Sequence, residues 1–125
     1  MKFIITAALA IVMAACGSQD ATSPTASVSG DYALRMVNGT SLPYTFSDGS
    51  TLTSDVLTLR SDGTFSESAQ FRDGTVLVLQ GFYAANNGAI TFTDQDTGTA
   101  FSGSVSGDVL TEIFANGLTE VFQRI

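Results

Sequence analysis

The sequence of 125 residues contains no histidine, no tryptophan, one cysteine and only five lysines and arginines, against twelve aspartates and glutamates. Without histidine, a Ser-His-Asp or Cys-His catalytic arrangement and a Cys/His zinc site are excluded within this chain. The lone cysteine excludes an internal disulfide. The formal charge of −7 argues against nucleic-acid binding, and the 44% of hydrophobic residues argues against a disordered acidic chain. The length predicts one folded domain.

The first fifteen residues have the features of an export signal. Lys2 supplies a positive start, and residues 3–13 (FIITAALAIVM) form an apolar run without a charge. The run is too short to span a bilayer, which requires about 20 helical residues. We therefore predict a signal peptide over residues 1–15.

The end of this segment, Met13-Ala14-Ala15-Cys16, resembles the lipobox of bacterial lipoproteins, in which small residues precede a cysteine that is acylated. The resemblance implies that Cys16 becomes the lipidated N-terminus, with acyl chains such as palmitate in the membrane. Gly17 and Ser18 resemble the signal for sorting to the periplasmic face of the outer membrane, so we expect a location in the cell envelope. An ordinary signal peptide followed by a chance cysteine is the alternative.

The segment after the cysteine reads as a tether. Residues 17–29 (GSQDATSPTASVS) are small and polar and offer almost nothing to bury. The predicted organisation is a signal peptide at 1–15, a lipidated cysteine and flexible tether at 16–29, and a domain at 30–125.

The domain segment is divided by regularly spaced turn dipeptides. Asparagine or aspartate followed by glycine is favoured in tight hairpins, because both residues tolerate a left-handed backbone. Six such dipeptides occur, at residues 38–39, 48–49, 62–63, 73–74, 87–88 and 116–117, and Gly107-Asp108 fits a type II′ turn. The intervening segments have strand length and frequent alternation: Tyr32–Val37, Pro43–Phe46, Thr51–Arg60, Thr64–Arg72, Thr75–Ala84, Ala89–Thr93, Ala100–Ser106, Val109–Phe114 and Leu118–Arg124.

Consecutive antiparallel strands form a meander, whose two edges must be hidden. Closure into an up-and-down barrel of eight strands achieves this, and we predict that all-β fold. A flattened two-sheet sandwich is the alternative, but nearest-neighbour hairpins leave little room for its long crossovers. Leu59, Phe65, Tyr83, Phe92 and Leu110 are predicted core residues.

The same segment resembles the bacterial lipocalin-like domain family over residues 30–125. The resemblance rests on Gly30-Asp-Tyr-Ala-Leu34 with Val37-Asn-Gly39, on residues 57–65 (LTLRSDGTF), on Gly81-Phe-Tyr83 with Ile90-Thr-Phe92, and on residues 101–111. Tyr32 stands where lipocalins have tryptophan. Members of such families bind small apolar molecules inside the barrel, so the resemblance implies a ligand-binding interior.

The three glutamates are the candidate polar groups of that interior. Glu67 alternates with Phe65, Ala69 and Phe71, while Glu112 and Glu120 alternate with leucine and phenylalanine in their own strands. Residues two apart on a strand share a face, so each glutamate is predicted beside large apolar groups. A buried carboxylate is costly unless it is paired or protonated, which favours a polar anchor in a cavity.

Arg124, in the phase of Glu120, is a candidate to balance its charge, and Tyr83 is a further candidate ligand contact. The alternative is that these strands expose their aromatic faces. Loop length matters here: a two-residue Asn116-Gly117 turn separates Glu112 and Glu120, whereas a three-residue loop sets them opposite each other. Likewise, a two-residue turn places Glu67 across from Gln80, and a three-residue turn places it across from Leu79.

The aspartates all read as tether, turn or strand-end residues. Asp94-Gln-Asp96-Thr-Gly98 has the spacing of half a calcium loop, but Ser104 stands where the bidentate glutamate is needed, so a plain hairpin loop is expected. Paired carboxylates could suggest glycosidase chemistry. No sequence feature fixes their separation, and we expect no enzymatic activity, metal or cofactor. The prediction is a monomeric barrel that binds a small apolar or amphipathic ligand; the alternative is a structural or interaction lipoprotein whose barrel is filled by side chains.

Overall fold

A computed structural model describes residues 28–125 of the chain. The predicted signal peptide, Cys16 and the tether as far as residue 27 lie outside the described residues. Within residues 28–125, no helix is both long and apolar enough to cross a membrane.

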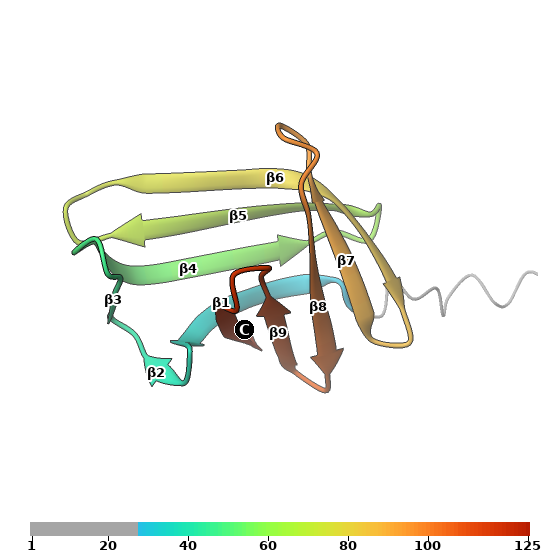
Figure 1. Cartoon of the computed structure of the whole chain (residues 1–125). Coiled ribbons are helices and arrows are strands. Elements are labelled where there is room, and N and C mark those ends of the chain that lie inside the picture. The colour runs from blue at the N-terminus through green and yellow to red at the C-terminus, as the bar shows by residue number, and fades with distance from the viewer. Residues whose placement is uncertain (1–27) are drawn as a thin grey trace, which may run out of the picture.

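The described chain folds into ten antiparallel strands (Figure 1). They are β1 (Gly30–Val37), β2 (Thr40–Ser41), β3 (Tyr44–Thr45), β4 (Thr51–Leu59), β5 (Thr64–Phe71), β6 (Val76–Asn86), β7 (Ala89–Asp94), β8 (Ala100–Ser106), β9 (Val109–Ile113) and β10 (Thr119–Arg124). In Figure 1, β4, β5 and β6 lie side by side across the upper part of the view, and β7 and β8 run steeply at the right.

The sheet closes on itself through β1. This strand pairs with β10 on one side and with β4 on the other, so that β1 and β4 to β10 form an eight-stranded barrel. The short strands β2 and β3 belong to the connection between β1 and β4. The predicted eight-stranded barrel is confirmed, and the sandwich alternative is wrong.

The asparagine- and aspartate-glycine dipeptides form two kinds of hairpin. Asn38-Gly39 and Asn87-Gly88 form two-residue loops with positive φ at both residues, 51° and 81° in the first and 54° and 85° in the second. Such angles define the type I′ turn, which matches the twist of the strands it joins.

The other four asparagine- or aspartate-glycine dipeptides end three-residue loops. The residue before each loop donates its N–H to the carbonyl oxygen of the residue after the loop, and its own carbonyl oxygen accepts the N–H of the loop glycine. The residues are Phe46 with Ser50 and Gly49, Arg60 with Thr64 and Gly63, Phe71 with Thr75 and Gly74, and Phe114 with Leu118 and Gly117. The aspartate or asparagine side chain accepts the N–H two residues further on. These loops decide which carboxylates face each other inside the barrel.

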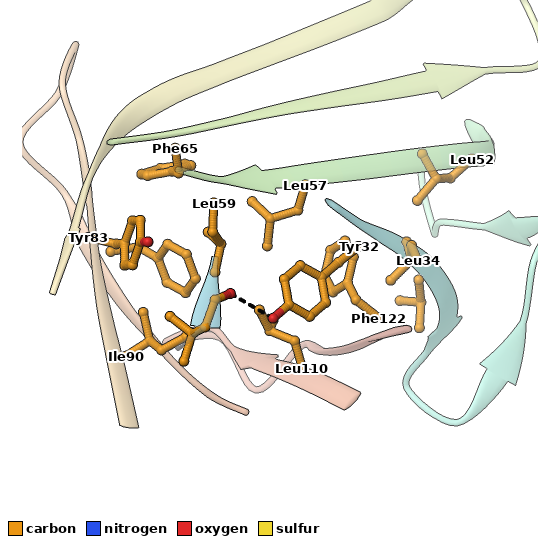
Figure 2. Packing of buried hydrophobic residues seen from close by; sticks show 13 residues of the cluster. Tyr32, Leu34, Leu52, Leu57, Leu59, Phe65, Tyr83, Ile90, Leu110 and Phe122 are labelled. Carbon is orange, nitrogen blue, oxygen red and sulfur yellow. Dashed lines mark hydrogen bonds between the residues drawn. The ribbon is translucent and has the colours of Figure 1, made fainter. Parts of the chain in front are cut away.

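The hydrophobic core fills one end of the barrel. Leu57 and Leu59 point from β4 toward Tyr32, Phe122 and Leu110 (Figure 2). All five residues predicted as core are buried, which confirms that prediction: Leu59, Phe65, Tyr83, Phe92 and Leu110. Both ends of the described chain lie here, since β1 begins beside Leu59 and Arg124 pairs with Tyr32. This filled end is called the base below.

Val28 belongs to the base although the sequence placed it in the tether. Its side chain is buried, and its carbonyl oxygen accepts a hydrogen bond of 2.7 Å from the Tyr32 hydroxyl, drawn as the dashed line in Figure 2. The packed structure therefore includes two residues before the predicted boundary at Gly30.

Candidate functional site

Three glutamates from three strands and one aspartate converge in the middle of the barrel. Glu67 lies on β5, Glu112 on β9 and Glu120 on β10. The three-residue loop before Leu118 sets Glu112 opposite Glu120, and the loop before Thr75 sets Glu67 opposite Leu79. Glu112 and Glu120 are both buried. The alternative that β9 and β10 turn these faces toward solvent is therefore wrong.

Asp55 is the fourth acid, and the sequence analysis missed it. It was placed with turn and strand-end aspartates, but it lies within β4 and is only 4% exposed. A bulge between Leu52 and Ser54 adds one residue to β4, so that both Leu52 and Asp55 face inward. Its alternation with Leu57 and Leu59 was the available signal.

The carboxyl groups lie within the distance of a shared ligand. One oxygen each of Asp55, Glu67 and Glu120 lie within 4.8 Å of one another. Asp55 Oδ1 and both carboxyl oxygens of Glu112 have no hydrogen-bond partner within the described chain. Chemically, this group of acceptors can hold protons, a metal ion or an organic cation. Asp55, Glu67, Glu112 and Glu120 are called the acidic cluster below.

Burial dominates the electrostatics of the acidic cluster. It raises the pKa of Asp55 and of Glu120 to about 7, and it raises the pKa of Glu67 and Glu112 well above their usual range. The charges of neighbouring carboxyls raise the pKa of Asp55, Glu67 and Glu112 further. The cluster is therefore partly protonated at neutral pH and sheds protons as the pH rises.

A cavity of about 370 Å³ lies above the acidic cluster, at the end of the barrel opposite the base. Its floor includes Asp55, Glu67 and Glu120, and its other lining residues are apolar: Phe46, Leu52, Ala69, Phe71, Leu77, Val78, Leu79 and Phe114. Leu77 and Val78 are more than half exposed, so the apolar lining continues to the rim. This volume falls in the range of pockets for small ligands, about 300–1,000 Å³.

Tyr83 and Arg124 lie away from this cavity. The Tyr83 hydroxyl donates a hydrogen bond of 2.6 Å to the Arg60 carbonyl oxygen in the base. The Arg124 guanidinium forms a salt bridge of 3.3 Å to Asp108, donates to the Ser29 carbonyl and covers the Tyr32 ring. The expected ion pair between Arg124 and Glu120 is not formed, because the two residues lie at opposite ends of β10 and Arg124 pairs with Asp108 instead.

Two other regions of residues 28–125 carry polar side chains beside a loop or a hollow. The Asp94–Gly98 segment is the hairpin loop between β7 and β8, held by hydrogen bonds from Gly98 N–H to the Asp94 carbonyl and from Asp96 N–H to the Asp94 carboxylate. A hollow of about 540 Å³ lies on the flank where β1 and β4 separate, lined by residues that include the exposed Arg35, Thr53 and Val56. Neither brings together a group of convergent polar side chains comparable to the acidic cluster.

Comparisons with known proteins agree with this architecture. No family model matches the chain, and no curated protein matches it. A lipocalin-like protein from Bacteroides uniformis has a similar structure, with a TM-score of 0.52, 18% sequence identity, and 78% of this chain and 97% of that one covered. An uncharacterized protein from Bacteroides eggerthii matches with a TM-score of 0.51 and 16% identity, over 78% of this chain and 98% of that one. The fold of this chain is lipocalin-like.

Proposed function

We propose that this protein is a membrane-anchored bacterial lipoprotein whose barrel binds a small amphipathic ligand. The observation that carries the binding function is the cavity at the open end, with apolar walls over a floor of carboxyl groups. A barrel filled by side chains from end to end would have no such space. The lipocalin-like fold, in which eight strands can enclose one small ligand, supports the same proposal.

The lining determines the polarity of the ligand. Aromatic and aliphatic side chains surround most of the cavity, so burial of an apolar body would supply most of the binding free energy. Asp55, Glu67 and Glu120 would orient a polar end toward the floor. We propose binding without catalysis, since the sequence has no histidine to serve as the base of a Ser-His or Cys-His arrangement.

The anchoring part of the proposal rests on the sequence. The lipobox resemblance at Met13–Cys16 would place a lipid on Cys16, and a chain of negative charge needs such an anchor to stay on an anionic membrane. The periplasmic face of the outer membrane is the proposed location.

Native mass spectrometry of protein extracted from its own membrane tests the binding function. We expect wild-type protein to carry a small molecule at near-stoichiometric ratio. Ala69→Trp, which fills the cavity from its lining, should lose that molecule. Ala84→Trp, on the exposed face of β6, is the matched control and should retain it.

A different result would support the other function. If the wild-type protein and both variants show only the mass of the lipidated polypeptide, with no added small molecule, the barrel acts as a structural or interaction module. The filled base, with Phe65 and Phe92 in contact at 5.2 Å between ring centroids, is the observation that favours this alternative.

A further inference from the structure

The cavity combines two chemistries that select different parts of one ligand. Phe46, Phe71 and Phe114 lie around it together with leucine side chains, and no side-chain hydroxyl or amide is among its lining residues. All of its polar side chains are carboxyls. A ligand that matches both regions must be apolar along most of its surface and must present hydrogen-bond donors at one end.

Asp55 leaves an acceptor unused at the floor. The residue is 4% exposed, yet its Oδ1 accepts no hydrogen bond from any residue of the described chain. Asp55 lines the cavity, and one of its carboxyl oxygens lies within 4.8 Å of oxygens of Glu67 and Glu120, so the Asp55 carboxyl is placed at the floor that a ligand would contact. A buried acceptor without a donor is unfavourable, and a bound donor would remove that penalty.

Residues 28–125 supply no positive charge to the acidic cluster. Among residues 28–125, Arg35, Arg60 and Arg72 are exposed, and Arg124 is engaged with Asp108 in the base. The elements around the cluster contribute Asp55 from β4, Glu67 from β5, Glu112 from β9 and Glu120 from β10. The inward side chains of β1 and β6 at this level are apolar, as in Leu34, Val37 and Leu79. The negative charge of the acidic cluster must therefore be compensated by protons or by a bound cation.

We propose, building on the binding function above, that the ligand is an organic ammonium ion with an apolar body, held through its N–H groups by Asp55, Glu67 and Glu120. A primary ammonium group carries three donors, and the floor offers three convergent carboxyls. The faces of the phenylalanine rings attract the ammonium group as it enters the cavity. Once the ammonium group reaches the floor, the same rings pack against the apolar body of the ligand. A fatty acid would instead bring a further carboxylate to a floor made of carboxyl groups, and repulsion from those that are ionised would weaken its binding.

A divalent metal ion fits this lining less well. Calcium takes six to eight oxygen ligands, commonly including carbonyl groups and water. The side chains that line the cavity supply no oxygens beyond the carboxyls, and its phenylalanine and leucine walls would contribute nothing to a metal. The apolar walls thus favour an organic cation over a metal as the occupant.

Three probes of one shape and different charge test the inference. Full-length protein is held in nanodiscs at pH 7.5, and empty nanodiscs serve as the blank. Calorimetry measures binding of 2-phenylethylammonium, of the neutral 2-phenylethanol and of the anionic 3-phenylpropanoate, with calcium chloride alone as the metal probe. We expect the ammonium ion to bind at least tenfold more tightly than the alcohol, and the carboxylate to bind more weakly than both.

Isosteric substitutions identify the groups responsible. Asp55→Asn with Glu67→Gln should weaken the ammonium ion at least tenfold and leave the affinity of the alcohol unchanged or higher. The control is Asp96→Asn on the exposed β7–β8 loop, which should change neither affinity. Circular dichroism verifies the fold of each variant.

A readout on the wild-type protein does not depend on any variant. Because the carboxyls must be ionised to hold the cation, the affinity for 2-phenylethylammonium should rise between pH 5.5 and 8, whereas that for 2-phenylethanol should stay constant. Equal affinities for the three probes, or a pH-independent ammonium affinity, would overturn the inference while the binding function stands. Tight calcium binding with no preference for the ammonium ion would overturn it in favour of a metal. No binding of any organic probe would overturn the binding function itself.

Discussion

Glu112 and Glu120 stand opposite each other across the β9–β10 ladder, both turned into the barrel, with Glu112 fully buried and Glu120 7% exposed. Like charges opposed in a ladder are unfavourable, and both carboxyl oxygens of Glu112 have no hydrogen-bond partner in the described chain. The pair therefore has an unfavourable ionised form, which makes the stability of the domain dependent on pH.

Glu112→Gln should stabilise the domain at neutral pH. Burial raises the pKa of Glu112 in the folded state, so as the pH rises above about 4.5 the unfolded chain loses its proton first and the folded state loses relative stability. Glutamine keeps the shape and cannot ionise. Urea unfolding should show a gain of roughly 1–3 kcal/mol at pH 7.5 and little gain at pH 4.5.

The exposed Asp96→Asn is the control for that experiment, with an expected change of less than about 0.5 kcal/mol. An equal gain for Glu112→Gln at both pH values would show that ionisation is not the cause.

The carboxyl carbon of Glu67 should titrate well above the ordinary value of 4.5 in an NMR experiment. Burial is the main cause, and the neighbouring Asp55 carboxyl adds to it, so the two should titrate as a coupled pair. Asp55→Asn should shift the Glu67 midpoint downward. A wild-type midpoint at or below 4.5 would mean that Glu67 is solvated or paired, and the acidic floor would lose its central member.

Cys16→Ser should abolish lipid attachment. The lipobox reading makes the Cys16 thiol the only acylation point, since the chain has no other cysteine. Partitioning into a detergent phase measures the result: wild-type protein and Ser18→Ala should enter that phase, and Cys16→Ser should not. Equal partitioning of the serine variant would refute the anchoring proposal.

Gly81→Ala should destabilise the barrel strongly. Gly81 of β6 pairs with Phe65 of β5 on one side and with Asp94 of β7 on the other. A Cβ at this position would overlap the Thr93 carbonyl oxygen. Relief requires a backbone shift, for which we expect a loss of roughly 2–4 kcal/mol in the free energy of unfolding. Gly103→Ala, whose Cβ would come within 2.9 Å of the Thr111 oxygen, is the graded comparison and should lose less.

The strands and their order could be predicted from the sequence because each hairpin carries its own chemical signature. Asparagine-glycine at 38–39 and 87–88 produced type I′ turns, and alternation located Phe65 and Leu110 in the core. These are local properties, in which a residue and its near neighbours determine the outcome. Closure into a barrel followed from the need to remove two strand edges.

The composition of the site could be predicted only in part. Glu67, Glu112 and Glu120 were recognised by their alternation, but whether Glu112 faced Glu120 depended on one additional loop residue, which the dipeptide Asn116-Gly117 does not specify. Asp55 was missed because the bulge in β4 breaks the alternation that starts at Leu52. Arg124 and Glu120 are an even number of residues apart in β10 and were therefore expected to share a face. That alternation does not tell how far apart the two side chains lie along the strand.

The polypeptide enters and leaves the barrel at the base, where Gly30 pairs with Leu59 and Tyr32 with Arg124, while the cavity opens at the opposite end. A lipid on Cys16 would thus be connected, through the predicted tether, to the closed end of the barrel. Because the cavity opens at the other end, the proposed ligand would be exchanged with the aqueous compartment and not taken from the acyl chains of the membrane. In such an arrangement, the proposed ligand would come from the solutes that pass the membrane surface.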